Sequence, residues 1–193
     1  MATALVLAAP LGLTACTGSS GRDPSPSPTA TGVAATPDPT PTAPSTSRSS
    51  KPERPAAMDS FDIEGAIAAA TYITALYPYV YNTGDLTEWK TLSHPECIFC
   101  TSVVEGVEEL HGQGFHNEGG QILVEGATAV ELNPGRSFSA DLSLRQGPAT
   151  VVDSSGNQVG EPSQEVSSGM TFILFIDQGN WQIREAETKP HEE

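Results

Sequence analysis

Residues 17 to 57 limit the possible folds of this chain most, because this stretch cannot build a hydrophobic core. It holds nine of the sixteen prolines and is otherwise mostly Ser, Thr, Ala and Gly. Such a segment has too little apolar surface to offset the conformational entropy lost on ordering. We expect a disordered tether over residues 16–57, which leaves residues 58–193 as one folded domain.

The apolar stretch before the tether has the features of an export signal. Residues 2–13 are too short to span a bilayer as a helix, but have the length of a signal-peptide core. No Lys or Arg precedes them, although signal peptides carry a positive charge there, so we expect translation to start further upstream. A buried N-terminal helix is the alternative interpretation.

The sequence Leu13-Thr14-Ala15-Cys16 resembles a bacterial lipobox. The resemblance implies that residues 1–15 are a lipoprotein signal peptide and that the Cys16 thiol carries a diacylglyceryl group. Cys16 would then be the first residue of the mature protein. The expected location is the extracytoplasmic face of the cell membrane, with the lipid as anchor.

The charge of the expected domain excludes some partners. Residues 58–193 contain 21 acidic and five basic side chains, a net charge of −16, against −15 for the whole chain. A surface this acidic repels nucleic acid and anionic lipid headgroups. We therefore expect no nucleic-acid partner, and contact with the membrane only through the lipid on Cys16.

The first half of the domain has helical periodicity. Apolar residues at spacings of three and four predict an amphipathic helix over residues 63–81. Asp62 is a candidate N-cap, and Gly84 can adopt the left-handed conformation that ends a helix. Pro78 lies within this pattern and is expected to kink the last turn or end the helix early.

Two further helices are expected before the period changes. The second is short and carries Trp89, and the third begins at Pro95 and ends near Gly112. After Gly120 apolar and polar residues alternate, which predicts antiparallel strands. The expected strands cover residues 121–132, 137–146, 149–153, 166–176 and 181–186.

This order of elements resembles the nuclear transport factor 2-like fold. Helices followed by an antiparallel meander indicate an α+β domain, with three N-terminal helices packed on a curved sheet to form a cone. The phrase "TGDLTEWKTLSHPECIFCTSVV", together with "GQGFHNEGG", is similar to a family of actinobacterial lipoproteins of unknown function. The resemblance implies the fold and the lipid anchor, and it implies no reaction.

The Cys97-x-x-Cys100 pair admits three interpretations. Outside the cytosol neighbouring thiols oxidise, which favours a structural disulfide. The spacing also occurs in thiol–disulfide redox proteins, but the βαβ context of such motifs is missing. A zinc site with His94 and either His111 or His116 would need both thiols free, and its spacing matches no established zinc finger.

A cone of this kind can enclose a pocket, and Tyr72, Trp89 and Asp141 are the candidate pocket residues. Asp141 is the candidate general base, although its alternation with apolar neighbours favours the solvated face of a strand. No recognisable acid–base or nucleophilic constellation is present, so we expect no cofactor and no assigned catalytic residue. The favoured function is a non-catalytic domain that binds an unidentified protein or small molecule, or supports a complex, at the cell envelope. The alternatives are a small-molecule enzyme with a cavity carboxylate and a CxxC redox protein.

Overall fold

The computed structural model describes residues 50–190. The predicted signal peptide, the lipidated Cys16 and most of the predicted tether lie outside the described residues. The described elements follow one another along the chain as a 3₁₀ turn, three helices and six strands. They are η1 (Ala56–Asp59), α1 (Ile63–Thr83), α2 (Thr87–Leu92), α3 (Ile98–Gly112), β1 (His116–Gly119), β2 (Ile122–Asn133), β3 (Ser137–Gln146), β4 (Ala149–Val152), β5 (Val166–Asp177) and β6 (Asn180–Pro190).

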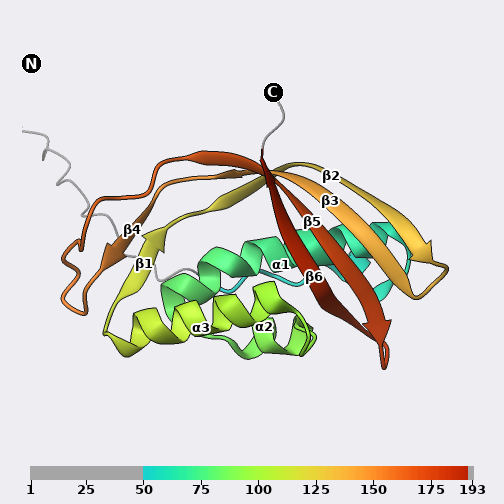
Figure 1. Cartoon of the computed structure of the whole chain (residues 1–193), viewed down its shortest axis with the longest axis horizontal. Coiled ribbons are helices and arrows are strands. Elements are labelled where there is room, and N and C mark those ends of the chain that lie inside the picture. Colours follow the sequence, from blue (N-terminus) through green and yellow to red (C-terminus); the bar gives the residue numbers. More distant parts are fainter. Residues whose placement is uncertain (1–49, 191–193) are drawn as a thin grey trace, which may run out of the picture. The chain divides into compact units, whose positions relative to one another are not determined.

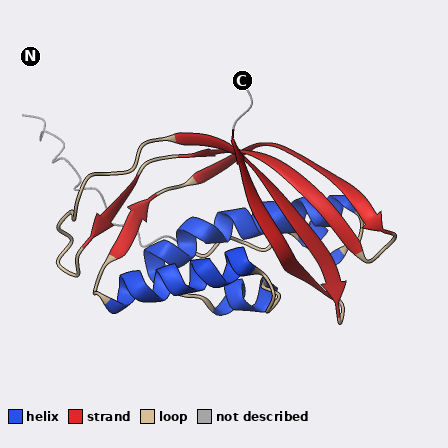
Figure 2. Cartoon of the chain, viewed as in Figure 1, coloured by secondary structure: helices blue, strands red, loops and turns tan. Residues whose placement is uncertain are grey.

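The strands form a curved sheet on one side of the helices (Figures 1 and 2). The four-stranded sheet has the order β2-β3-β5-β6, and every neighbouring pair is antiparallel. β1 and β4 pair separately as a short antiparallel ribbon. The molecule is therefore a mixed α+β domain with helices packed on antiparallel sheet, which confirms the predicted fold class.

α1 begins and ends at the predicted signals. The Asp62 carboxylate accepts a hydrogen bond from the Gly65 amide at 2.9 Å, and Gly84 adopts the left-handed conformation with φ of 75°. The expectation that Pro78 shortens the regular helix was wrong, because α1 continues to Thr83. α1 has buried residues on several of its faces, Pro78 among them, so packing outweighs the hydrogen bond that proline removes.

α3 starts three residues later than predicted. Pro95 lies in a turn, and the helix begins at Ile98 with Cys97 as its N-cap. The Cys97 sulfur accepts a hydrogen bond from the Cys100 amide at 3.1 Å, and the Cys97 amide donates to the His94 carbonyl at 2.9 Å. The sulfur therefore takes the capping role that Ser93 or His94 was expected to play.

The strands match the predicted alternation with two differences. β3 has the predicted bounds, and its alternate side chains Phe138, Ala140, Leu142 and Leu144 are buried. β6 continues beyond residue 186 to Pro190 because it pairs with β5 along its whole length. β1 was not predicted, since its sequence HNEG carries no apolar alternation and its register comes from pairing with β4.

The two ends of the described chain are joined through the core. The indole nitrogen of Trp181 on β6 donates to the Met58 carbonyl in η1 at 2.9 Å. Lys51, which was predicted to belong to the tether, forms an ion pair with Glu88 on α2 at 2.6 Å. Ser93, after α2, forms a parallel bridge with Ile183. The last strand thus holds the segments on both sides of α1 in place.

Candidate functional site

A small cavity lies between the helices and the concave face of the sheet. Its volume is about 120 Å³. Aromatic and aliphatic side chains dominate its wall, with four uncharged polar side chains among them. The lining residues are Ile73, Thr74, Tyr77, Trp89, Phe99, Ile122, Leu144, Gln146, Ser168, Met170, Phe172 and Thr188.

Tyr77 is the one titratable residue in this wall. Burial raises the pKa of its phenol to about 12, and the neighbouring Tyr81 adds to the shift. Its ring lies 5.0 Å from that of Tyr81, 6.3 Å from that of Trp89 and 6.4 Å from that of Phe99. Because a phenol with so high a pKa stays protonated at neutral pH, Tyr77 can donate a hydrogen bond but cannot act as a base there.

Of the three predicted pocket residues, only Trp89 lines the cavity. Tyr72 is buried on α1, but it is not part of the cavity wall. Burial raises the pKa of Tyr72, with the negative charge of Glu88 as the next cause. Tyr72 and Asp141 were both predicted as pocket residues, but neither belongs to the cavity wall.

Asp141 lies on the outer face of the sheet, opposite to the buried side chains of β3. It accepts hydrogen bonds from the Thr171 hydroxyl at 2.5 Å and from the Lys189 ammonium at 3.0 Å. These two bonds hold the pKa of the Asp141 carboxyl below its usual value. An exposed carboxylate with a low pKa, tied to a lysine, is a poor general base for a substrate held in the cavity.

The Cys97–Cys100 pair is oxidised to a disulfide, as the favoured interpretation predicted. Both residues are buried, and the indole nitrogen of Trp89 donates to the Cys100 carbonyl at 3.2 Å. The disulfide uses both thiols that the zinc interpretation required. No group of three or more His, Cys, Asp and Glu side chains suited to a metal ion occurs within residues 50–190.

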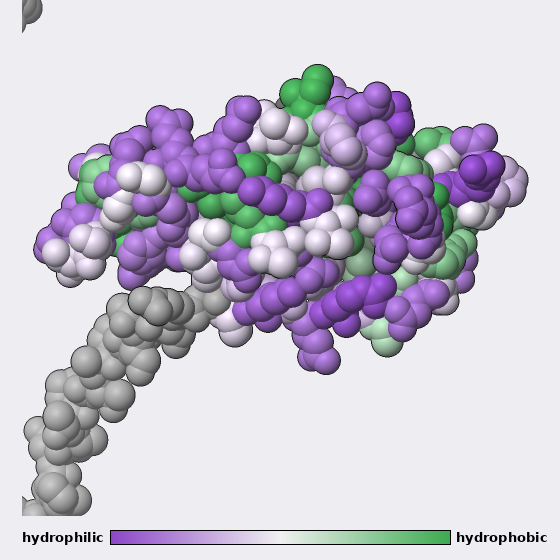
Figure 3. Space-filling model, turned by 90° about the horizontal axis from the view of Figure 1, so that it is seen from below, coloured by the Kyte–Doolittle hydropathy of each residue, from purple (hydrophilic) through white to green (hydrophobic). Residues whose placement is uncertain are grey.

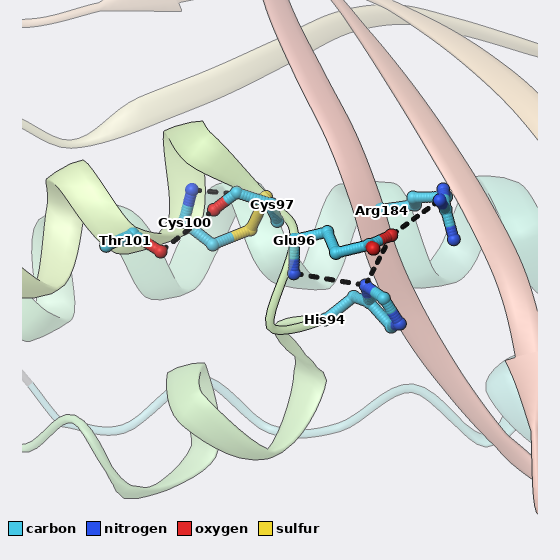
Figure 4. A network of polar contacts seen from close by, with 6 residues as sticks. All are labelled: His94, Glu96, Cys97, Cys100, Thr101 and Arg184. Atoms are coloured by element: carbon cyan, nitrogen blue, oxygen red, sulfur yellow. Dashed lines mark hydrogen bonds and ion pairs between the residues drawn. A yellow bond between two sulfur atoms is a disulfide. The ribbon is translucent and has the colours of Figure 1, made fainter.

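A polar network surrounds the disulfide turn (Figure 4). The Glu96 carboxylate forms an ion pair with Arg184 at 2.5 Å, and the Glu96 amide donates to the His94 ring at 3.2 Å. The His94 ring also packs edge-on against Phe175, with centroids 5.1 Å apart. The segment that precedes α3 is thereby attached to β5 and β6.

A groove of about 430 Å³ lies beside this network, between the start of α3 and β6. The sequence alone does not predict this groove, because its walls come from segments that lie far apart in the chain. The available signal was Ile98, an isoleucine enclosed between two cysteines, whose surface is 83% exposed. The lining residues are Glu96, Ile98, Phe99, Thr171, Ile173, Glu185, Ala186 and Glu187.

The surface around these features is mostly hydrophilic. The face seen in Figure 3 shows isolated hydrophobic areas surrounded by hydrophilic residues. In the described part of the chain, none of the helices combines the length and apolar character needed to cross a membrane.

Residues 40–187 match the model of a family described as "Family of unknown function (DUF6318)". The comparison with curated proteins gives no significant match. The predicted likeness to a family of unknown function is thus confirmed, whereas its description as an actinobacterial lipoprotein family remains a prediction.

Several solved structures are similar in fold. The intermembrane space region of chloroplast protein ARC6 has a TM-score of 0.53 at 10% identity, over 67% of this chain and 98% of that one. An uncharacterised protein with a cystatin-like fold from Caulobacter vibrioides has a TM-score of 0.41 at 13% identity, over 64% and 88% of the two chains. Aln2 from a Streptomyces species has a TM-score of 0.42 at 12% identity, over 65% and 90%. At these identities the likeness concerns the fold alone.

Proposed function

This chain belongs to the family of unknown function DUF6318, and we propose that its domain is a non-catalytic accessory module that binds another protein at the cell envelope. The observation that carries the proposal is the composition and size of the interior cavity. Its twelve lining residues include no carboxylate, histidine, lysine, arginine or free thiol. Hydroxyl groups of Ser, Thr and Tyr do line the cavity, but a nucleophilic hydroxyl needs an adjacent general base, and the wall offers none.

The cavity volume favours a protein partner over a small-molecule ligand. Small-molecule sites usually enclose about 300–1,000 Å³. The cavity between the helices and the sheet measures about 120 Å³, which admits a few waters or a small fragment. The larger hollow is the groove of about 430 Å³ beside α3, and its wall includes the edge strand β6, to which an extended polypeptide segment can add.

We further propose that the module is a lipoprotein held on the extracytoplasmic face of the membrane by Cys16. The lipobox-like sequence that ends at Cys16 and the proline-rich segment after it support this location. The Cys97–Cys100 disulfide supports it as well, because disulfides persist mainly in oxidising compartments. A tether of about forty residues spans roughly 35 Å as a flexible coil, which lets the domain reach partners away from the bilayer.

Expression of the gene in a bacterial host, with the coding sequence upstream of Met1 included and a Cys16→Ala variant as control, tests the proposal. We expect an intact mass that shows a lipid-modified Cys16, and loss of membrane association in the variant. Cross-linking in membranes, followed by mass spectrometry, should recover a protein partner. Recovery of a retained metabolite in place of a protein would overturn the accessory assignment, and an unmodified cytosolic chain would overturn the location.

A further inference from the structure

The groove between α3 and β6 has an unpaired strand edge along one side. β6 is the last strand of the four-stranded sheet, so it has a β neighbour on one side only. The His94 amide donates to the Ile183 carbonyl at 2.9 Å and covers the beginning of the free edge. Within residues 50–190 no further backbone hydrogen bond reaches that edge beyond Ile183. An extended peptide could therefore add to β6 from Glu185 onward.

The groove carries a local excess of negative charge. Glu96, Glu185 and Glu187 line it, and Arg184 is paired with Glu96. Neither Glu185 nor Glu187 forms an ion pair with another described residue, and both are exposed. They flank Ala186 on β6 and point to the outer face of the sheet, where they pair across the strands with Ile173 and Thr171. A positively charged segment fits this wall.

The opposite wall presents an apolar side chain in a fixed position. Ile98 lies between the two cysteines of the disulfide and is 83% exposed, whereas Phe99 next to it points inward and lines both the groove and the cavity. The disulfide holds the turn that orients these two residues. Charged residues on an edge strand also protect against aggregation, but an exposed isoleucine beside the edge works against that purpose.

We propose that this groove binds an extended basic segment of the partner protein as an added strand beside β6. Lysine or arginine side chains of the segment pair with Glu185 and Glu187 across the strands, since directly opposite residues lie close enough to interact. The side chains in between point to the other face, where an apolar residue packs on Ile98. The inference rests on the proposed partner-binding function and adds the site and the chemistry of the partner.

Binding of a synthetic peptide to the full-length protein tests the groove. The probe is a short dye-labelled peptide in which lysine and valine alternate, and its affinity is measured by fluorescence anisotropy. We expect the Glu185→Gln/Glu187→Gln variant to bind it about three- to tenfold more weakly, the loss typical of two exposed charge pairs. The matched control removes two exposed charges elsewhere, by Glu161→Gln/Glu165→Gln, and should bind as the original protein does.

Two further comparisons test the apolar contact and the strand addition. Ile98→Ser should weaken binding several-fold because an apolar contact is lost, whereas Leu123→Ser, at an exposed leucine on β2, should leave it unchanged. A peptide methylated at every backbone nitrogen keeps its charges but has no N–H group to donate on either edge, so it should bind much more weakly. Equal loss in both double variants, or undiminished binding of the methylated peptide, would overturn the inference.

Failure of this site can be distinguished from failure of the proposed function. A photoreactive residue placed at position 98 of the full chain should form a cross-link to the partner, and one at position 123 should not. A partner that cross-links only from position 123 would overturn the groove and leave the accessory function in place. A chain that cross-links to no protein from either position would count against both.

Discussion

The indole nitrogen of Trp89 on α2 donates a hydrogen bond to the carbonyl of Cys100 on α3, 3.2 Å away. This bond joins the short second helix to the disulfide turn inside the core, where both residues are almost fully buried. The ring of Trp89 also lies 6.1 Å from that of Phe99. The Trp89 side chain thus holds the buried side of the disulfide turn, and Ile98 lies on the exposed side of the same turn, in the groove.

Trp89→Phe should lower the free energy of unfolding by about 1–3 kcal/mol, because a buried hydrogen bond and part of a packed ring are lost. Denaturant unfolding followed by circular dichroism measures the change. Phe61→Leu, at an exposed aromatic residue, serves as the control and should cost much less. Equal stability of the Trp89 variant and the original protein would contradict the assigned role.

Removing the disulfide should have a small effect on stability. The bond closes a loop with a sequence separation of only three residues, so it restricts the unfolded chain little. In Cys97→Ser/Cys100→Ala the serine can still cap α3, and the alanine fits a buried site. We expect a loss below about 2 kcal/mol in denaturant unfolding. A much larger loss would show that the disulfide stabilises the whole fold and does more than orient Ile98.

Asp141 should contribute a pH-dependent stabilisation. Its folded pKa is lowered by Thr171 and then by Lys189, so the contribution is present above the unfolded pKa and is lost as pH falls through the folded value. We expect Asp141→Asn to cost no more than about 1 kcal/mol near pH 7, since the pair is exposed. The difference between the two proteins should shrink below about pH 4. A difference that grows at low pH would contradict this sign.

The phenol of Tyr77 should ionise at a higher pH than an ordinary tyrosine. Its folded pKa of about 12 lies above the usual value of 10.0, so the neutral side chain stabilises the fold below pH 10 and this contribution is lost as pH rises toward 12. In an alkaline titration followed by phenolate absorbance, the increase near pH 12 should be smaller in Tyr77→Phe than in the original protein. Titration of Tyr77 at the usual pKa of a phenol would show that the cavity is open to water.

Two glycines in helices should respond in opposite ways to alanine. A Cβ at Gly65 would lie 1.9 Å from the backbone oxygen of Ser60, so Gly65→Ala must displace the entry to α1 and should cost at least about 1–3 kcal/mol. A Cβ at Gly112 meets nothing within 4 Å, and alanine favours helix, so Gly112→Ala should be neutral or slightly stabilising. Thermal unfolding of both variants measures this difference. Equal changes in stability would contradict the prediction.

Features set by neighbouring residues could be predicted from the sequence. The Asp62 cap, the left-handed Gly84 and the alternation of β3 depend on side chains within a few positions. The alternation also indicated the solvated face for Asp141, where the structure places it. Local chemistry therefore predicts the elements and many of their orientations.

Features that depend on distant contacts could not be predicted. Pro95 has the sequence properties of a first helical residue, but the hydrogen bond from His94 to Ile183 and the ion pair between Arg184 and Glu96 hold its segment as a turn. β1 exists because β4 pairs with it, and the groove exists because the sheet ends at β6, beside α3. In each case residues far apart in the chain decide the outcome.

The bond from Trp181 to Met58 spans 123 positions, and the bridge from Ser93 to Ile183 also joins distant parts of the chain. β6 follows both Met58 and Ser93 along the chain, so a ribosome delivers Trp181 and Ile183 only after all three helices. The helices consequently have no completed sheet to cover them until β6 has been synthesised. A chain that stops just before β6 would lack both long-range contacts and one edge of the sheet, and should not reach the native fold.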